Sequence, residues 1–469
     1  MNGKPMNEEL PGGFTVGLDA RVEWLSADTL LGGAPPRILR LSPAARALLT
    51  GQDCTVAGPV SGRLARSLLD AGVAHPRLSG VLRPVSVIVP VRDRPAGLAR
   101  LLGALHGTLP PGSEILVVDD GSADALAVRR AAAGSRVVRH DASRGPAAAR
   151  NTGFSLARND IAVFLDSDVV PLPGWLPPLL AHFDDPAVGL AAPRIVGLGA
   201  ERGALAAYER VRSSLDLGPH EAPVVPRTRV AYVPSAALAV RVAAAPGGFA
   251  EDMTVAEDVE LVCRLHAAGW RLRYDPSALV AHEHRDHFLP WLARKAFYGT
   301  GAAPLAVRHP GTVPPVNLPL WAAAACVLLG TQRRRGVLAA AAVGAVATWR
   351  LGRSLHARPR PLSTAARLNA MALGGAVWQS AAVLTRHWWP LALLTACVSR
   401  RTRRAVLAAA LAEGLADWYR HRGALDPARY LVLHRLDDLA YGAGVWWGAI
   451  RGRTAAPLLP RFAGFRGRR

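Results

Sequence analysis

The sequence predicts an α/β protein, with a mostly parallel sheet covered by helices on both faces and an α-helical region after it. The first observation is that, over residues 83–305, short runs rich in valine and isoleucine alternate with longer segments of helical pattern. This order is typical of parallel strands connected by helices, because such strands are apolar on both faces. The second observation is that the composition changes after residue 305 to mostly alanine, leucine and arginine.

Length and composition narrow the class of protein further. The chain has 469 residues, of which 50% are hydrophobic and 19% are charged. This length favours several domains, and this composition excludes a generally disordered chain. The four cysteines lie far apart without a CxxC pair, so we expect neither a disulfide framework nor a zinc site. The first ten residues contain no apolar run, so no secretory signal is expected.

Residues 1–82 are expected to form a small module of their own. Short strands are predicted over residues 21–24, 30–31 and 37–41. Ser42 and Pro43 favour the N-cap and the first position of a helix, and a second helix is expected over residues 63–71. Strands followed by short helices suggest a winged-helix-like α+β module, and no residue cluster in it indicates catalysis.

The second region, residues 83–305, carries the alternation of strands and helices. Strands are predicted over residues 85–89, 114–118, 136–140 and 161–165, and helices over residues 97–106, 122–133 and 146–157. Ligands of open sheets of this kind bind at the carboxyl ends of the strands. The polar residues that follow these strands are therefore the candidate site.

Two neighbouring carboxylates, Asp119 and Asp120, follow the second predicted strand. Gly121 allows a tight turn there, and Ser122 can cap the next helix. A carboxylate at this position can accept hydrogen bonds from the N–H of a base or from ribose hydroxyls. A turn followed by a helix cap explains the same residues without a ligand. The first strand ends at Pro90, which we expect to stop its pairing.

Asp166 and Asp168 follow the fourth predicted strand. Two carboxylates at one strand end can hold Mg²⁺ or Mn²⁺ together with phosphate oxygens. Arg150 lies about one turn into the helix predicted over residues 146–157, from which it could bind a diphosphate with two nitrogens. A solvated helical arginine is the alternative interpretation.

Glu257 and Asp258 open a further predicted helix. Acids in a first turn suit the helix dipole, which is the structural interpretation. In the functional interpretation, Asp258 is a general base at the edge of the same crevice. His282 and His284 follow the strand predicted over residues 271–280 and share one face. Either histidine can complete a metal site, and a solvated histidine is the alternative.

The last third of the chain is strongly basic. Residues 331–469 contain 23 arginines, no lysine and five acids, a net charge of +18. Uncharged runs are separated by arginine clusters; they cover residues 311–332, 336–349, 368–385 and 387–399. This pattern favours an anionic membrane surface over nucleic acid as the partner. Spanning helices, re-entrant hairpins and interfacial helices are all compatible with it, and a soluble alanine-rich helical domain is the alternative.

In this order, the motifs resemble those of the family 2 glycosyltransferases of the GT-A fold. The matching segments are the strand ending at Pro90 and residues 119–122, 149–153, 166–168, 247–249 and 257–258. The processive members carry Gln-x-x-Arg-Trp after the base, whereas residues 291–299 here read Trp-Leu-Ala-Arg-Lys-Ala-Phe-Tyr-Gly. This departure places the extension of a long polymer in doubt.

The resemblance implies a role for each of these residues. A nucleotide-sugar donor would be bound by Pro90, Val91, Asp93, Asp119, Asp120, Arg150 and Asp166. Within this set, Asp119 and Asp120 would contact the uridine, and Arg150 would lie near the diphosphate. Asp168 would bind the metal, and we expect His284 as a further ligand. Asp258 would deprotonate the acceptor hydroxyl for an in-line displacement with inversion.

Lys295 is a separate hypothesis from composition. It is one of only two lysines in a chain with 56 basic residues. The chain uses arginine at the other 54 of these positions. A lysine in such a sequence can mark a site that needs a compact ammonium, which approaches a single oxygen. We therefore expect Lys295 or Arg294 to steady the leaving diphosphate, with Tyr298 beside the acceptor. A stray lysine in a surface helix is the alternative.

A closer resemblance, over nearly the whole chain, is to the glycosyltransferases of mycofactocin biosynthesis. It rests on residues 13–16, 74–76, 144–153, 192–195, 211–216, 294–299 and 435–438. It implies transfer of β-linked glucose, from a UDP donor, to premycofactocin, a small cofactor precursor made from a peptide. Residues 1–82 also resemble the small peptide-binding domains of such pathways, which implies a pathway peptide or protein as a partner.

Three functions therefore remain in competition. The first is an inverting, metal-dependent transferase acting on a small cofactor precursor at the cytoplasmic face of the cell membrane. The second has the same chemistry but acts on a lipid-linked or cell-envelope glycan. The third is a non-catalytic protein that binds a peptide and a sugar nucleotide. The expected division is a recognition module over 1–82, a GT-A domain over 83–305 and a basic helical region over 306–469.

Overall fold

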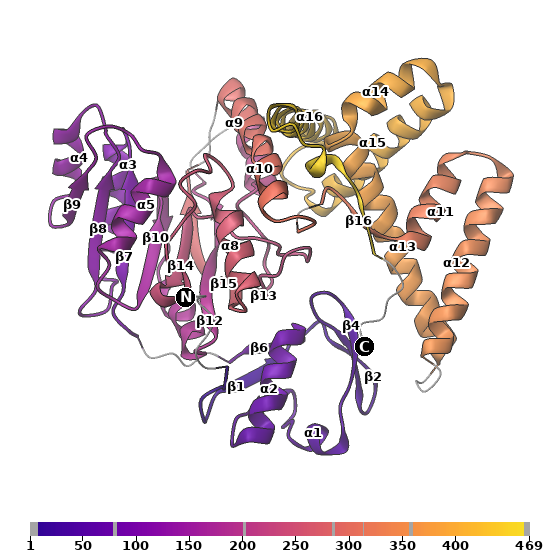
Figure 1. The fold of residues 1–469 in the computed structure, drawn as a ribbon, viewed down its shortest axis with the longest axis horizontal. Coiled ribbons are helices and arrows are strands. Elements are labelled where there is room, and N and C mark those ends of the chain that lie inside the picture. Colours follow the sequence, from indigo (N-terminus) through magenta and orange to yellow (C-terminus); the bar gives the residue numbers. More distant parts are fainter. Residues whose placement is uncertain are drawn as a thin grey trace. The chain divides into compact units, whose positions relative to one another are not determined.

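The computed structural model describes residues 8–77, 82–199, 203–283, 287–312, 314–355 and 360–463. The chain forms two compact units (Figure 1). Unit 1 comprises residues 1–201 and 212–284, and unit 2 comprises residues 202–211 and 285–469.

Unit 1 begins with a small α+β module. Its elements are β1 (Thr15–Leu18), β2 (Glu23–Ser26), β3 (Thr29–Gly32), β4 (Arg37–Arg40), α1 (Pro43–Ala47), β5 (Asp53–Thr55), α2 (Pro59–Ala71) and β6 (Ala74–Pro76). The strands form two small sheets, one in the order β5-β1-β6 and one in the order β2-β3-β4. Ser42 caps α1 as predicted, because its side chain accepts a hydrogen bond from the N–H of Ala45. The winged-helix comparison stays an expectation.

The remainder of unit 1 is built on one sheet of nine strands. Its strands are β7 (Ser86–Val91), β8 (Glu114–Asp119), β9 (Arg136–Arg139), β10 (Ile161–Leu165), β11 (Val169–Pro171), β12 (Val188–Gly197), β13 (Ala222–Pro223), β14 (Ala237–Arg241) and β15 (Arg271–His282). Its helices are α3 (Pro95–Leu105), α4 (Ala125–Ala131), α5 (Pro146–Ser155), α6 (Leu176–Ala181) and α8 (Glu257–Ala267). The four strands and three helices predicted from residue 85 to residue 165 are confirmed within a few residues.

The sheet is mixed, which corrects the expectation of a mostly parallel one. Strands β10, β7, β8 and β9 are parallel neighbours, as the alternation predicted. Strand β14 lies between β10 and β12 and is antiparallel to both. Strand β15 is parallel to β12 but antiparallel to β11. A run of apolar residues predicts a buried strand but carries no information about its direction.

Alternate residues of the strands pack on opposite faces of the sheet, which explains the helices on both faces. Val87 and Val89 of β7 belong to one core with α3 and α6, whereas Ile88 belongs to a second core with α5 and α8. Strand β10 alternates in the same way, with Val163 in the first core and Phe164 in the second. This two-residue period follows from the pleat of a strand.

The N-terminal module contacts the sheet domain through ion pairs. Arg66 of α2 donates two hydrogen bonds of 2.7 Å to Asp185, which is 3% exposed. Arg271 of β15 donates to Asp70 of α2 at 3.0 Å. A cavity of about 260 Å³ lies beside these pairs. None of the residues that sequence analysis assigned to the nucleotide-sugar site lines this cavity.

Unit 2 is helical, as the sequence predicts. It contains α7 (Ala204–Arg212), α9 (Phe288–Thr300), α10 (Ala302–Arg308), α11 (Leu320–Gly330), α12 (Arg334–Ser354), α13 (Pro361–Arg386), α14 (Trp389–Val398), α15 (Arg400–Arg420) and α16 (Pro427–Arg451), with short strands β16 (Asn317–Pro319) and β17 (Arg461–Ala463). In the described part of the chain, no helix has both the length and the hydropathy that crossing a membrane requires.

Helix α9 packs against α16, so it belongs with the C-terminal helices although sequence analysis grouped it with residues 83–305. Glycines allow this close contact. A side chain at Gly299 of α9 would collide with the backbone of Tyr441 and Val445, and one at Gly444 of α16 would collide with the backbone of Ala296. Glycine spacing of this kind predicts close helix packing only once the partner helix is known.

Candidate active site

The site begins at the carboxyl end of β10, where Asp166 and Asp168 follow an apolar strand. The N–H of Asp166 donates to the carbonyl of Ala236 at 2.9 Å, which fixes the end of β10 beside β14. Strand β11 then pairs with β15 so that Val169 lies opposite His282. This register brings His282 Nε2 within 3.6 Å of Asp168 Oδ1.

These residues fit a divalent cation. Asp168 Oδ1 is buried and has no hydrogen-bond partner among the described residues. Burial raises the pKa of Asp166 above its ordinary value; Arg150 opposes this shift and the charge of Asp168 adds to it. Two carboxylates that repel each other beside an imidazole form a donor set that suits Mg²⁺ or Mn²⁺. The expected ligand His284 lies outside the described residues.

Arg94 is a cation at this site that sequence analysis did not assign. It is the N-cap residue of α3, and its Nη1 donates to Asp168 Oδ2 at 3.0 Å. It follows the first strand by three residues, so its position after a strand end was the available signal. The guanidinium therefore compensates one oxygen of Asp168, while the other accepts no hydrogen bond from the described residues.

Arg150 connects the two acidic motifs rather than pointing into solvent. It is 3% exposed, its Nη2 donates to Asp166 Oδ1 at 2.7 Å, and its Nη1 donates to Glu257 Oε1 at 2.9 Å. Its guanidinium also lies over the Phe249 ring, 5.5 Å from the centroid. Both terminal nitrogens are thus engaged by carboxylates, and its expected contact with a diphosphate stays a prediction.

Asp258 lies in the first turn of α8, next to Glu257. Its Oδ2 accepts from the N–H of Ser235 at 3.1 Å, and its Oδ1 accepts from the N–H of Val259 at 2.8 Å. Burial, followed by the charge of Glu257, raises the pKa of Asp258 to about 7. A carboxyl with this pKa can accept a proton near neutral pH, as a general base requires.

Asn151 holds the segment before α8 in place. Its Oδ1 accepts from the N–H of Phe249 at 2.7 Å, and its Nδ2 donates to the carbonyl of Phe249 at 2.9 Å. Gly248 approaches this amide so closely that a side chain there would collide with it. The motifs at 149–153 and 247–249 therefore pack directly against each other, which sequence spacing alone does not show.

The carboxylates of Asp119 and Asp120 are buried and already accept hydrogen bonds. Asp119 accepts from Arg139 and from the N–H of Ser122. Asp120 lies 2.7 Å from His140 Nδ1. It also accepts hydrogen bonds of 2.7 to 2.9 Å from Ser143 Oγ and from the N–H groups of Arg144 and Gly145. Burial would raise the pKa of Asp120, but these donors hold it below its ordinary value. The two carboxylates thus hold the backbone at Ser122, Arg144 and Gly145 in place. Their contact with a uridine stays a prediction.

The end of β7 supports the same edge of the sheet. The strand continues one residue beyond Pro90, with Val91 opposite Asp119, which corrects the expectation that Pro90 ends the pairing. The carbonyl of Val91 accepts from the N–H of Asp120 at 2.9 Å. Asp93 accepts from the N–H of Ala123 and lies in the left-handed region with a φ of 55°.

Lys295 is buried in unit 2. Its ammonium lies 2.9 Å from Glu209 Oε1 and 3.1 Å from Asp437 Oδ2, and the residue is 5% exposed. This burial contradicts the alternative of a stray surface lysine. Its expected contact with the leaving diphosphate stays a prediction, since both of its contacts here are carboxylates of unit 2.

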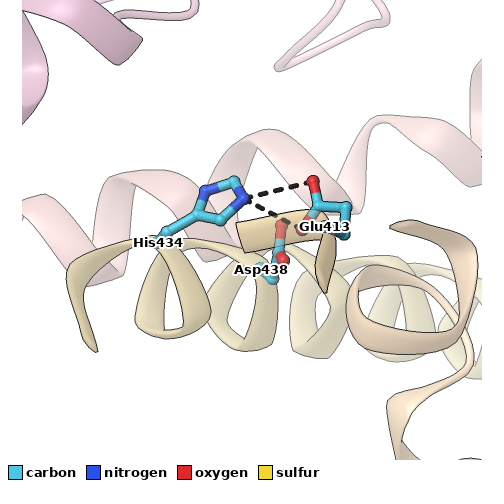
Figure 2. Close-up of side chains that lie close together, drawn as sticks. All are labelled: Glu413, His434 and Asp438. Carbon is cyan, nitrogen blue, oxygen red and sulfur yellow. Dashed lines mark hydrogen bonds and ion pairs between the residues drawn. The ribbon is translucent and has the colours of Figure 1, made fainter. Parts of the chain in front are cut away.

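A second group of metal-type side chains lies in unit 2. Glu413, His434 and Asp438 come close together, and His434 Nε2 lies 3.2 Å from Glu413 (Figure 2). Arg435 contacts Glu413 and lies 3.2 Å from Asp438 Oδ2. A guanidinium thus already compensates the two carboxylates, so the group is a buried ion-pair network.

Comparisons with known proteins identify relatives of this chain. The sequence model described as "Glycosyl transferase family 2" matches residues 86–241, which span β7 to β14. The pre-mycofactocin glycosyltransferase of Mycobacterium tuberculosis is 47% identical over 467 residues, covering 96% of this chain and 98% of the relative. The validoxylamine A glucosyltransferase of Streptomyces hygroscopicus subsp. limoneus is 36% identical over 110 residues, covering 22% of this chain and 24% of the relative.

Solved structures also match part of the chain. The mannosyltransferase PcManGT from Pyrobaculum calidifontis, in complex with GDP-Man and Mn²⁺, has a TM-score of 0.39 and 22% identity, covering 64% of this chain and 87% of that one. S. aureus TarS 1–349 has a TM-score of 0.37 and 22% identity, covering 48% of this chain and 65% of that one.

Proposed function

Because the chain belongs to the family 2 glycosyltransferases and is close to the pre-mycofactocin glycosyltransferase over nearly its whole length, we propose that it moves a hexose to a hydroxyl of premycofactocin with inversion. The fold is GT-A-like, with a mixed α/β sheet and a helical C-terminal half. The proposed donor is UDP-glucose, and the proposed product carries a β-linked sugar.

The observation that carries this proposal is the carboxyl of Asp258. Its pKa is raised to about 7, and two backbone N–H groups hold its oxygens in fixed directions. Arg150 connects the adjacent Glu257 to Asp166, so the base and the Asp-x-Asp motif belong to one network. A proton acceptor held beside a nucleotide-sugar motif is what a direct displacement at the anomeric carbon needs.

The proposed reaction is a single displacement. The acceptor oxygen attacks the anomeric carbon and forms the new C–O bond while the bond to the nucleotide diphosphate breaks. Asp258 takes the proton of the acceptor hydroxyl, and the diphosphate leaves with the electron pair of the broken bond. One displacement inverts the anomeric centre, so an α-configured donor gives a β-configured product.

Asp166, Asp168 and His282 are the described residues that would hold a divalent cation. When bound, such a cation supplies positive charge against the diphosphate of the donor. Two observations support this assignment: Asp168 Oδ1 accepts no hydrogen bond from the described residues, and the pKa of Asp166 is raised. His284 remains a second candidate ligand, since it shares the end of the same chain segment.

The nucleotide is proposed to lie along the loop ends of β7 and β8, beside Pro90, Val91 and Asp93. Asp119 and Asp120 shape this edge through their buried hydrogen bonds. In the same proposal, Lys295 steadies the diphosphate; the competing assignment is that it supports α9 against α16 through its ion pairs. Residues 1–82 are proposed to recognise the peptide-derived part of the acceptor or a pathway protein.

The proposal is tested by incubating the purified full chain with premycofactocin, UDP-glucose and MnCl₂ and following the mass of the acceptor. Wild-type protein should add hexose units to premycofactocin, and Asp258→Asn should be slower by about 10²–10⁴-fold. Asp160→Asn is the matched control, because Asp160 is an exposed acid that precedes β10, at the end opposite Asp166. This control should keep wild-type turnover.

The competing functions predict different outcomes of the same assay. A transferase for lipid-linked or envelope glycans would leave premycofactocin unmodified but label a lipid extract with hexose. A non-catalytic binding protein would bind UDP-glucose without modifying either acceptor. Equal turnover of wild-type protein and Asp258→Asn would contradict the assignment of the base.

A further inference from the structure

The few acids of the last third are turned inward. No acid occurs between Asp286 and Glu413, and only five occur after residue 331. Four of these five are buried at 4 to 6% exposure: Glu413, Asp417, Asp437 and Asp438. Arg386, Arg435 and Lys295 pair with members of this buried group. Most of the other described arginines of this region are exposed.

Two helix hairpins of unit 2 bring the densest arginine clusters together. One hairpin joins α11 to α12 through residues 331–333, and the other joins α14 to α15 through Ser399 (Figure 1). Gln332 Nε2 donates to the carbonyl of Arg401 at 2.7 Å, so the two turns touch. The arginines of this surface, here called the tip surface, are Arg333, Arg334, Arg335, Arg400, Arg401, Arg403 and Arg404, and all are exposed.

Large apolar side chains are exposed beside these arginines. Val398 is 87% exposed, Val327 73%, Leu338 70% and Leu394 67%. They belong to α11, α12 and α14, three of the four helices whose ends meet at the tip surface. A solvated basic surface needs no such side chains, whereas an interfacial surface combines them with cations.

The position of the arginines is unfavourable for the isolated fold. Arg334 and Arg335 begin α12, and Arg400, Arg401, Arg403 and Arg404 fall in the first turns of α15. Cations at a helix N-terminus oppose the helix dipole. Neither first turn contains an acid that would compensate them. A partner that supplies negative charge removes this repulsion.

We propose that the tip surface docks on the surface of an anionic phospholipid bilayer. The arginines bind lipid phosphates, and the exposed leucines and valines enter the boundary between headgroups and acyl chains. Both turns contribute, because the Gln332–Arg401 contact aligns their clusters on one surface. The partner is a lipid surface rather than nucleic acid, since a polyphosphate chain offers no apolar phase to Val398 and Leu394.

Flotation of the full chain with vesicles tests this proposal. Wild-type protein should float with vesicles of phosphatidylcholine and phosphatidylglycerol, remain behind with phosphatidylcholine alone, and release at high salt. Arg334→Gln/Arg400→Gln/Arg401→Gln should weaken partition into anionic vesicles by at least tenfold. Removing these charges from helix N-termini should leave the fold intact, which thermal unfolding checks.

The matched control removes the same charge elsewhere on unit 2. Arg420, Arg422 and Arg429 are exposed and lie around the far end of α15 and the start of α16. Arg420→Gln/Arg422→Gln/Arg429→Gln should keep wild-type partition. A Leu338→Ser/Leu394→Ser/Val398→Ser variant keeps every charge and should also lose binding, which separates insertion from simple charge attraction.

Three results would overturn the proposal. One is that wild-type protein floats equally well with neutral and anionic vesicles, or floats with neither. Another is unchanged partition of the arginine tip variant. The third is tighter binding to a duplex DNA oligonucleotide that displaces the protein from vesicles. Glycosyl transfer in solution is independent of all three, so failure here leaves the proposed reaction standing.

Discussion

Arg150 lies between Asp166 and Glu257 and donates one hydrogen bond to each carboxylate, at 2.7 and 2.9 Å. The three residues come from α5, from the end of β10 and from α8, which are far apart in the sequence. This one buried guanidinium thus couples the segment that ends in Asp168 to the helix that presents Asp258.

Replacing Arg150 by methionine should destabilise unit 1. The change leaves Glu257, which is 8% exposed, without its cationic partner. Breaking a buried ion pair from one side costs about 3–5 kcal/mol. Denaturant unfolding followed by tryptophan fluorescence measures the loss. Arg144→Met is the control, because the Arg144 side chain is 56% exposed and its pair with Glu251 should contribute only about 0–1 kcal/mol. Similar losses for both variants would contradict this role of Arg150.

Asp258→Asn should stabilise the protein more at pH 8 than at pH 5. The pKa of Asp258 is raised from 3.8 to about 7, so the folded state keeps a proton that the unfolded state has lost. The stability that this proton contributes is fully present below pH 3.8 and is lost as the pH rises to about 7. Asparagine does not titrate, so the variant does not lose this part of its free energy of unfolding as the pH rises. Melting temperatures at the two pH values measure the effect, with Asp160→Asn as the control. A difference between variant and wild type that does not grow with pH would show that Asp258 titrates normally.

His282→Ala should weaken binding of Mn²⁺ to the full chain, measured directly by calorimetry without donor. The pairing of β11 with β15 brings His282 Nε2 to 3.6 Å from Asp168 Oδ1. Loss of one of a few ligands should reduce the affinity at least tenfold. His266→Ala is the control, since His266 lies on α8 outside this group. His284→Ala run in parallel decides between the two histidines; a weaker effect at His282 than at His284 would reverse the assignment.

Lys295→Met should lower the stability of unit 2. It leaves Glu209 and Asp437, which are 8% and 5% exposed, without the ammonium between them. The expected loss of about 3–5 kcal/mol follows from the two buried carboxylates. Lys295→Arg retains the charge and separates the two interpretations. A donor contact predicts a raised KM for UDP-glucose with unchanged stability, whereas the ion-pair role predicts a change in stability with unchanged KM.

The parallel half of the sheet could be predicted from the sequence because β7, β8 and β10 are continuous apolar runs that end in polar motifs. The direction of β14 could not, since Ala237–Arg241 reads equally well as a parallel strand. Asp166, Asp168 and Asp258 were found because acids at strand and helix ends form recognisable motifs. Their connection through Arg150 and Glu257 needed the fold, because no spacing shows which carboxylates a guanidinium will reach.

The same limit applies to the histidines and to Lys295. His282 and His284 share a strand face in the sequence, and the pairing of Val169 with His282 shows how one of them comes close to Asp168. Lys295 was singled out by the rarity of lysine, but its contacts with Glu209 and Asp437 depend on how α7, α9 and α16 pack. Tertiary contacts of this kind have no local sequence pattern.

Proton NMR of the first glycosylated product tests the central claim most directly. The purified chain is given UDP-glucose, whose anomeric carbon is α-configured, together with premycofactocin, and the anomeric signal of the product is followed from the first turnover. A single displacement with Asp258 as the base predicts a β-configured sugar on the acceptor. An α-configured first product would contradict the account, because a single in-line displacement cannot retain the configuration of the anomeric carbon.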